Sequence, residues 1–278
     1  MILVSGGAGY IGSNTLIALR EMGYDEVLSV DNFMNSSADS YERLELILGK
    51  PLECVECDLA DREQCLRLFE DHDIEGIIHF AALKSVPESI EKPNLYYRNN
   101  LNSLNNLLEA CRKHQIQKFI FSSSCTVYGN PEDLPVSENS PLALAESPYG
   151  LTKQLGEMML ENFCSIHSDF KAISLRYFNP AGAHESGKIG ETITDRPSSL
   201  VPILAQQAIG IRDKVIVFGD DYQTPDGSCI RDYIHVSDIA EAHVLAYDFL
   251  NKMKMKYEVF NLGSGLGNST LEVVKTFE

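Results

Sequence analysis

Short apolar runs alternate with helix-length amphipathic stretches through the first 175 residues. The runs have the length and composition of buried strands, and they lie at 2–5, 26–30, 52–56, 76–80, 118–122 and 172–175. Between the runs, apolar residues recur at spacings of three to five, as at Ile11, Leu16 and Leu19. Because strand and helix alternate in this way, the sequence predicts a parallel sheet with helices on both faces.

The pattern changes after Tyr177, where residues 179–199 are rich in Gly, Pro, Ser and charge and are expected to form an irregular loop. A helix at 200–209, a strand at 214–218, a helix at 236–251 and a strand at 257–262 are expected to follow. We therefore expect an α/β fold: a doubly wound, Rossmann-type parallel sheet over 1–176, followed by a smaller C-terminal domain over 177–278. The segment 232–262 is expected to return to the main sheet. An amphipathic helix is expected at 270–278, and we expect the domain to continue beyond it.

Charge and cysteine usage narrow the range of partners. The chain carries 40 acidic and 23 basic residues, a formal net charge of −17. Such a surface repels phosphate backbones and anionic lipid, so neither nucleic acid nor a membrane is an expected partner. There is no basic leader and no long apolar run, and seven cysteines follow no framework spacing, so we expect reduced thiols in the cytoplasm. Cys54 and Cys57 lack the second pair that a zinc site needs, so no metal is expected.

A glycine-rich segment, Gly6-Gly7-Ala8-Gly9-Tyr10-Ile11-Gly12, follows the first strand and opens a helix. Glycines at this spacing allow a tight turn and close approach of a pyrophosphate, which the helix N-terminus stabilises. Asp31 ends the second strand, 19 positions after Gly12, where a carboxylate accepts hydrogen bonds from a ribose and repels a 2′-phosphate. The pattern favours NAD over NADP, with a plain turn at Asp31 as the alternative. Asp58 is expected either to meet the adenine or to cap a helix.

Tyr149 and Lys153 form the only Y-x-x-x-K in the chain and would lie one helical turn apart on one face. A tyrosine base at neutral pH needs its pKa lowered from ~10 by about three units, or roughly 4 kcal/mol, and a neighbouring ammonium and an oxidised nicotinamide act in that direction. A surface pair is the alternative for these two residues. Ser124 lies in a run of three serines at the end of a strand, where parallel sheets place ligand sites, and strand-end capping is the alternative there.

Seven motifs carry a resemblance to a known family, and they lie in the family's order along the chain. They are SGGAGYIGS, VDNFMNSS, IIHFAALKSVPES, FSSSCTVYG, SPYGLTK, LRYFNPAGAH and DGSCIRDYIHVSDIAEAH. On these residues the sequence resembles the extended short-chain dehydrogenases/reductases and, among them, the UDP-sugar 4-epimerases. The resemblance implies NAD-dependent, reversible epimerisation at C4 of a UDP-hexose through a transient 4-keto sugar. It also implies a homodimer formed through helices at 101–111 and 149–164, and a substrate-binding role for the C-terminal domain.

The resemblance also implies roles for individual residues. Tyr149 takes the proton of the sugar 4-hydroxyl, Ser124 and Thr126 orient that hydroxyl, and Lys153 tunes the tyrosine and holds the nicotinamide ribose. The implied NAD contacts are Gly6, Gly9, Tyr10, Ile11, Gly12, Asp31, Asn32, Asn35, Ser36, Asp58, Leu59, Phe80, Ala81, Ala82, Lys84, Asn99, Tyr149, Lys153 and Phe178. The implied substrate contacts are Ser124, Thr126, Tyr149, Asn179, Ser199, Leu200, Phe218, Arg231 and Tyr233. A guanidinium at Arg231 suits a diphosphate, and its alternative is an ion pair with Asp232 or a neighbouring acid.

Two departures and two rival functions bear on this reading. Ser198-Ser199 stands where the family usually has Asn-Asn, and family members continue beyond the last residue with further nucleotide-binding side chains.

A related 4,6-dehydratase or decarboxylase needs a carboxylic acid beside the strand-end serine, but Cys125-Thr126-Val127 follows Ser124. A non-catalytic NAD-binding protein is the second rival, and the intact Tyr149/Lys153 pair argues against it.

Overall fold

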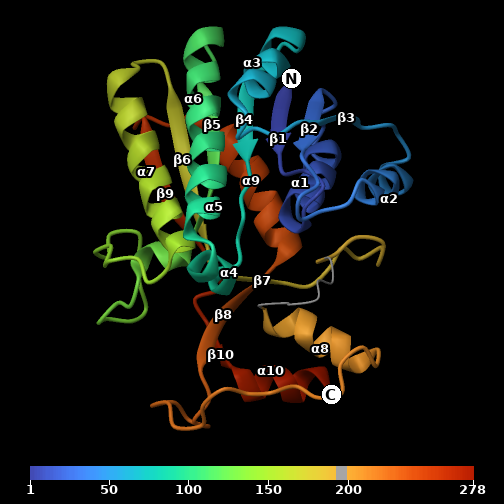
Figure 1. Cartoon of the computed structure of the whole chain (residues 1–278), viewed down its shortest axis with the longest axis vertical. Coiled ribbons are helices and arrows are strands. Elements are labelled where there is room, and N and C mark those ends of the chain that lie inside the picture. Colours follow the sequence, from blue (N-terminus) through green and yellow to red (C-terminus); the bar gives the residue numbers. More distant parts are fainter. Residues whose placement is uncertain (192–198) are drawn as a thin grey trace.

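The structure, a computed structural model, describes residues 1–191 and 199–278 and is built around a seven-stranded parallel sheet (Figure 1). The strand order is β3-β2-β1-β4-β5-β6-β9, and every neighbouring pair is parallel. The strands are β1 (Ile2–Ser5), β2 (Val27–Asp31), β3 (Glu53–Glu56), β4 (Gly76–His79), β5 (Lys118–Ser124), β6 (Lys171–Tyr177) and β9 (Tyr257–Leu262). This architecture confirms the predicted α/β, Rossmann-type fold class.

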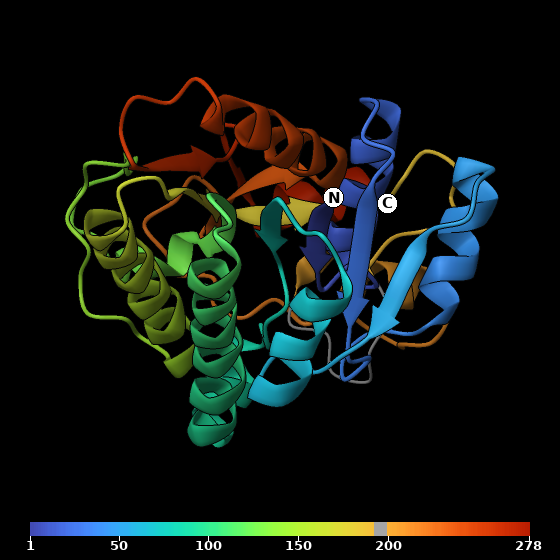
Figure 2. The same cartoon turned by 90° about the horizontal axis from the view of Figure 1, so that it is seen from above.

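Helices cover both faces of the sheet, as the view from above shows (Figure 2). One layer contains α1 (Tyr10–Glu21) and α9 (Val236–Leu250), which pack against each other. The other contains α3 (Arg62–Asp71), α6 (Asn102–His114) and α7 (Pro148–Ile166). Shorter helical segments complete the first part of the chain: α2 (Asp39–Leu48), α4 (Val86–Glu91), α5 (Pro93–Tyr96), the π-helical turn η1 (Tyr97–Leu101) and the 3₁₀ turn η2 (Cys125–Tyr128).

Alternate residues of each strand feed these two layers. Ile120 packs with the core under α1 and α9, whereas its neighbours Phe119 and Phe121 pack with the core under α3, α6 and α7. Ile78 and Ile77 on β4 divide in the same way. A strand with both faces buried carries a continuous apolar run, which is why these strands could be predicted from the sequence.

A second, three-stranded sheet organises the C-terminal part of the chain. Its order is β10-β8-β7, formed by β7 (Asn179–Ala181), β8 (Ile230–His235) and β10 (Gly267–Ser269), with α8 (Leu200–Ala208) and α10 (Thr270–Phe277) nearby (Figure 1). Helix α10 begins at Ser269 with a complete capping box that uses Glu272.

The strand predicted at 214–218 is wrong, because these residues have irregular backbone. Ile216 and Phe218 are 58% and 80% exposed, and no described strand lies beside them to accept their backbone hydrogen bonds. An apolar triplet alone does not make a strand when no neighbouring strand or core is available.

The sheet places its ligand-binding edge between β1 and β4. These strands are neighbours in space, but the chain leaves β1 toward β2 on one side and continues from β4 toward β5 on the other. Open parallel sheets bind ligands at the carboxyl ends of the strands where the order reverses in this way. The loops after β1, β4 and β5 therefore define where the site has to be.

His79 at the end of β4 makes the free energy of unfolding depend on pH. Its Nδ1 lies 2.7 Å from the Ser5 hydroxyl, its ring packs against Phe119 and Phe121, and burial lowers its pKa to about 3. Histidine in an unfolded chain has a pKa of about 6.5. Between these values only the unfolded state binds the proton, so the free energy of unfolding falls as the pH falls.

We expect His79→Gln to remove this dependence on pH. The loss of unfolding free energy on acidification from about pH 6 to 5 should be smaller than in the wild type by about 1.2 kcal/mol. Urea unfolding at each pH measures it, with His184→Gln on a surface loop as the control. Equal pH slopes for wild type and His79→Gln would contradict the assignment.

Candidate active site

The glycine-rich turn lies at the predicted edge of the sheet and leaves no room for side chains. Gly6 has a φ of +74°, and a Cβ there would lie 2.8 Å from the backbone nitrogen of Ala81. A Cβ on Gly12 would lie 2.2 Å from the carbonyl oxygen of Gly6. Helix α1 begins directly after Gly9, with neither a side-chain cap nor an acidic residue in its first turn. Its positive end is thus available to an anion, as a pyrophosphate-binding turn requires.

Asp31 holds this turn to the loop that follows β2. One carboxylate oxygen accepts a hydrogen bond from the Ala8 nitrogen at 3.1 Å, and the other accepts from the Phe33 nitrogen at 3.0 Å and the Ser36 hydroxyl at 2.8 Å. These bonds organise the segment in which Asn32, Asn35 and Ser36 are expected to contact NAD. Asp31 therefore does more than form a local turn, which was the alternative for it, because it also binds the Ala8 nitrogen of the glycine-rich turn.

Asp58 lies beside the same loop. Its Oδ1 accepts hydrogen bonds from the Ala60 nitrogen at 3.0 Å and from the Asn32 side chain at 3.4 Å. The N-cap of α3 is Asp61, whose side chain accepts from two backbone nitrogens. Asp58 is therefore not a helix cap, which was the alternative for it.

The loop after β4 brings further predicted NAD contacts to the turn. The Ala81 nitrogen donates to the Ser5 hydroxyl at 3.3 Å. Lys84 pairs with Glu191 at 2.8 Å, and its Nζ lies 5.9 Å from the centre of the Tyr10 ring. Asn99 lies in the π-helical turn η1, an irregularity that often marks functional sites.

Asn100 was missed by the sequence analysis although it is buried at this site. Its Oδ1 accepts from the Leu83 nitrogen at 2.8 Å, and its Nδ2 donates to the Leu83 oxygen at 3.0 Å and to Thr152 Oγ1 at 3.1 Å. It thereby ties the loop after β4 to helix α7. The sequence carried a weak signal, two consecutive asparagines inside a helical pattern.

Tyr149, Lys153 and Ser124 come together at the carboxyl end of β5. Ser147 caps α7, and Pro148 occupies its first turn, which sets Tyr149 at the start of the helix. The Ser124 side chain acts on the pKa of the Tyr149 hydroxyl, so these two side chains lie close together. Lys153 is 4% exposed, its Nζ donates to the Ser122 carbonyl at 2.6 Å, and it lies 5.8 Å from the centre of the Tyr149 ring. A buried lysine is inconsistent with the surface-pair alternative.

Burial dominates the proton affinities of this group. It raises the pKa of Tyr149 to about 12, an effect that the hydrogen bond from Ser124 partly opposes. It lowers the pKa of Lys153 to about 7, an effect that the carboxylate of Glu157 partly opposes. Desolvation disfavours both charges, and its effect on the pKa of Tyr149 is the largest one.

A buried ion pair lies behind these residues and was also missed. Arg176 on β6 donates to both carboxylate oxygens of Glu157, at 2.9 and 2.6 Å, and both side chains are 5% exposed. Ser123 donates to the same carboxylate. The sequence offered one signal, an acid four residues after Lys153 on the same helix.

Three of the residues predicted to bind substrate, Asn179, Arg231 and Tyr233, lie on the small sheet. Asn179 on β7 pairs in register with Tyr233 on β8, and its side chain donates to the Asp232 carbonyl at 2.8 Å. Thr126 Oγ1 is buried and has no hydrogen-bond partner in the described part of the chain, so it is available to a ligand. Ser199 and Leu200 begin α8, and no contact described for 1–191 and 199–278 joins them or Phe218 to Tyr149.

Arg231 is exposed and donates to the Ile230 carbonyl at 2.7 Å. Its positive charge opposes the rise that burial causes in the pKa of Cys125 in η2 and of Tyr233. The predicted alternative, an ion pair with Asp232, is not formed. The Asp232 carboxylate instead accepts from Ser264 and from the Gly265 nitrogen.

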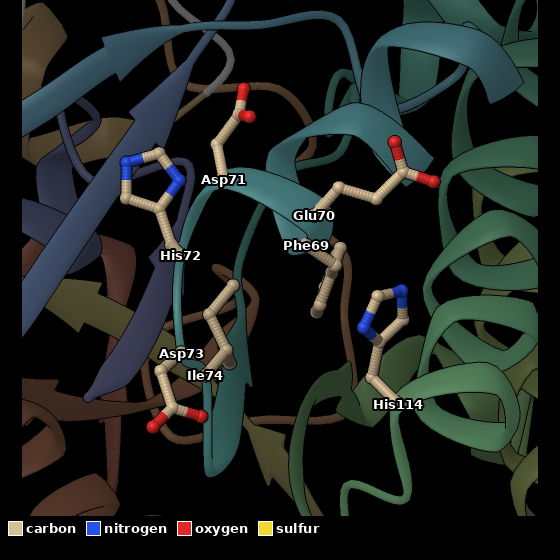
Figure 3. Close-up of a pocket in the computed structure, with 7 residues that line it drawn as sticks. All are labelled: Phe69, Glu70, Asp71, His72, Asp73, Ile74 and His114. Atoms are coloured by element: carbon tan, nitrogen blue, oxygen red, sulfur yellow. The ribbon is translucent and has the colours of Figure 1, made fainter.

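A hollow lies elsewhere in the structure, and none of the predicted site residues lines it (Figure 3). It is lined by Phe69, Glu70, Asp71, His72, Asp73, Ile74 and His114, at the ends of α3 and α6 that precede β4 and β5. This is the amino edge of the sheet, opposite Tyr149. Glu70 pairs with Lys113 at 2.7 Å, and His72 bonds to the Leu68 carbonyl at 2.9 Å. Among the described residues there is no group of acids, histidines or cysteines suited to a metal.

The fold and this group of residues define a nucleotide-cofactor enzyme of the short-chain dehydrogenase/reductase kind. A model of the NAD dependent epimerase/dehydratase family matches residues 2–263, and the chain belongs to that family. It is 48% identical to the UDP-glucose 4-epimerases of Erwinia amylovora and of Bacillus subtilis. Each match covers 100% of this chain, and 82% and 81% of the respective relatives.

Solved structures agree with these relatives. The UDP-glucose-4-epimerase of Stenotrophomonas maltophila, with bound NAD and formylated UDP-arabinopyranose, has a TM-score of 0.95 at 44% identity, covering 100% of this chain and 82% of that one. The enzyme of Bifidobacterium longum in complex with NAD+ and UDP has a TM-score of 0.93 at 47% identity, covering 99% and 81%. The resemblance seen in the motifs is confirmed.

Replacing Gly12 tests the turn. Gly12→Ala should displace the Gly6 carbonyl and abolish retention of NAD through gel filtration, measured by releasing and assaying the nucleotide. Gly23→Ala is the control, because its Cβ would have no atom within 4 Å although its φ is +93°. We expect the control to lose about 1 kcal/mol of stability but no NAD. Full NAD content in Gly12→Ala would refute the assignment of the turn.

Proposed function

We propose that the protein is an NAD-dependent UDP-hexose 4-epimerase that interconverts UDP-glucose and UDP-galactose. One observation carries the proposal. Tyr149 lies with the buried Ser124 and Lys153 at the edge of the sheet that also carries the glycine turn, in a chain 48% identical over its whole length to UDP-glucose 4-epimerases. The residues of the turn fit the cofactor. Their glycine backbone carries no side chains, and it leads into the start of α1, which has no side-chain cap.

Tyr149 accepts the proton of the sugar 4-hydroxyl as the alcohol becomes a ketone. It returns the proton when the ketone becomes an alcohol of the opposite configuration. When bound, NAD supplies the reversible uptake of a hydride. Ser124, which lies beside Tyr149, and the unpartnered Thr126 Oγ1 hold the sugar oxygen beside the phenol.

Lys153 provides the positive charge that the phenolate needs. With a pKa of about 7 it is partly protonated at neutral pH. The Lys153 Nζ lies close to the Tyr149 ring, and the lysine is buried. The protonated lysine therefore stabilises the ionised form of Tyr149. Both residues are thereby assigned to the acid–base step.

A 4,6-dehydratase is less well supported by the same group. Elimination at C5 and C6 needs an acid to protonate the leaving hydroxyl. The side chains that follow Ser124 along η2 are Cys125, Thr126 and Val127, and burial raises the pKa of Cys125 to about 11. A neutral thiol with that proton affinity is a poor substitute for a carboxylic acid.

The C-terminal part of the chain is assigned to the substrate, and the part through residue 176 to NAD. We place the diphosphate at Arg231, whose remaining guanidinium donors are unpaired within 1–191 and 199–278.

We also propose a homodimer through α6 and α7, supported by the exposed Met158 and Ile166 on α7, and a cytoplasmic location. No described helix is long and apolar enough to cross a membrane.

Tyr149→Phe removes only the acid–base hydroxyl. We expect interconversion of UDP-glucose and UDP-galactose to slow by about 10²–10⁴-fold, the usual worth of a general base, while NAD stays bound. Tyr247→Phe is the control, because that hydroxyl is buried without a hydrogen-bond partner in the described structure. A wild-type protein that holds NAD but leaves both sugars unchanged would favour the non-catalytic rival. A normal rate for Tyr149→Phe would remove the assigned base.

Arg231→Gln removes the proposed diphosphate contact. We expect the KM for UDP-glucose to rise about 10- to 100-fold, since a charged hydrogen bond contributes about 1.5–3 kcal/mol, with a smaller effect on kcat. Steady-state kinetics measures both constants, and Arg67→Gln on the exposed face of α3 is the control. An unchanged KM would move the diphosphate site elsewhere.

A further inference from the structure

The hydroxyl of Ser122 leads away from the catalytic group toward the opposite helical layer. Lys153 Nζ donates to the Ser122 carbonyl at 2.6 Å and lies 3.5 Å from the Ser122 hydroxyl. The Ser122 side chain also acts on the pKa of Tyr177 at the end of β6, opposing the rise that burial causes, so these two side chains lie close together. Lys153 lies 4.9 Å from the centre of the Phe121 ring, on the α7 side of the sheet, whereas Tyr177 packs in the core under α9.

The contacts continue from Tyr177 into α9. The Tyr177 hydroxyl lies 2.8 Å from Nε2 of His243, and Nδ1 of His243 lies 2.7 Å from the Ile239 carbonyl. Ser122, Tyr177 and His243 are 7%, 7% and 0% exposed, so water does not compete for these bonds. None of these three residues has an assigned role in the chemistry.

The Ile239 carbonyl fixes the direction of every bond in this series. A carbonyl oxygen only accepts, so Nδ1 of His243 carries the hydrogen. Burial lowers the pKa of His243 to about 4, so the ring is neutral and its Nε2 is an acceptor. The Tyr177 hydroxyl therefore donates to Nε2, which leaves its oxygen as an acceptor for the neighbouring Ser122 hydroxyl. A Ser122 hydroxyl that donates to Tyr177 presents its lone pairs toward the Lys153 Nζ, which lies 3.5 Å away.

We propose that His243, Tyr177 and Ser122 form a directional hydrogen-bond chain that positions Lys153 and holds it as a donor beneath Tyr149. This inference rests on the proposed function. None of the three touches the reacting atoms, so they are positioning residues. A reversed chain would point the Ser122 hydrogen at the ammonium and repel it. The chain thus offsets part of the cost of burying that charge.

Other groups around Lys153 have to be considered in a test. The titratable side chains that face it are His79 on β4, Tyr149 and Glu157 on α7, Tyr177 on β6 and, through the chain, His243 on α9. A useful variant therefore leaves all of these charges in place. Tyr177→Phe does so, because it deletes a single neutral hydroxyl.

For Tyr177→Phe we expect kcat to fall about 5- to 15-fold, as for one buried hydrogen bond, with the KM for UDP-glucose and the NAD content unchanged. Tyr257→Phe is the matched control, because its hydroxyl bonds to Ser174 at 2.8 Å elsewhere on the same sheet. His243→Leu should lose as much as Tyr177→Phe, and the double variant should lose no more than either single one. His243→Gln keeps an acceptor for Tyr177 and should restore most of the rate. Multiplicative losses in the double variant, or no rescue by glutamine, would overturn the chain.

A second measurement does not depend on turnover. Carbon-13 NMR of labelled lysine gives the pKa of Lys153 directly. In Tyr177→Phe the Ser122 hydroxyl loses its acceptor and no longer keeps its lone pairs toward Nζ, so the Lys153 pKa should fall by about 0.5 or more, whereas Tyr257→Phe should leave it unchanged. If the wild type fails to interconvert the sugars, the proposed function falls while this titration still decides the chain. An unchanged Lys153 pKa in Tyr177→Phe would refute the chain even in an active enzyme.

Discussion

The ammonium of Lys153 lies where water cannot solvate it, so the fold itself has to supply its hydrogen-bond acceptors. Burial lowers the pKa of this lysine to about 7 and raises that of Tyr149 to about 12, and both shifts oppose the charges that acid–base chemistry at the sugar requires. The Ser122 carbonyl and the carboxylate of Glu157 act in the other direction. The surrounding structure is best understood as the means of holding those compensating groups in place.

The end of β5 does this with three consecutive serines, each tied to a different element. The Ser122 carbonyl accepts from Lys153, and its side chain lies beside Tyr177. Ser123 donates to Glu157. Ser124 lies beside Tyr149 and accepts from the Thr126 nitrogen. Because side chains alternate across a strand, Ser123 faces the opposite side of the sheet from its neighbours. One strand end thereby connects α7, β6 and, through Tyr177, α9.

The central sheet and the local motifs could be predicted from the sequence because each is encoded within a short window. Strands buried on both faces carry apolar runs, and the glycine turn and the Tyr149/Lys153 pair have fixed spacings. The small sheet could not be predicted, because β8 mixes Arg231 and Asp232 with apolar residues and is only partly buried, whereas the apolar 214–218 lacks a neighbouring strand. Asn100, Arg176 and His243 also escaped notice, since their roles depend on partners 19 to 66 residues away.

The long-range partners matter for how the site responds to change. A side chain that contacts the sugar alters binding where it stands, but a residue that compensates a buried charge acts through the proton affinity of that charge. Arg176 neutralises Glu157, Glu157 favours the protonated lysine, and the lysine in turn favours ionised Tyr149. Substitutions in the core under α7 and α9 should therefore change the rate of proton transfer while leaving the substrate contacts intact. On this argument, the catalytic unit extends from the sugar-facing phenol to both helical layers of the fold.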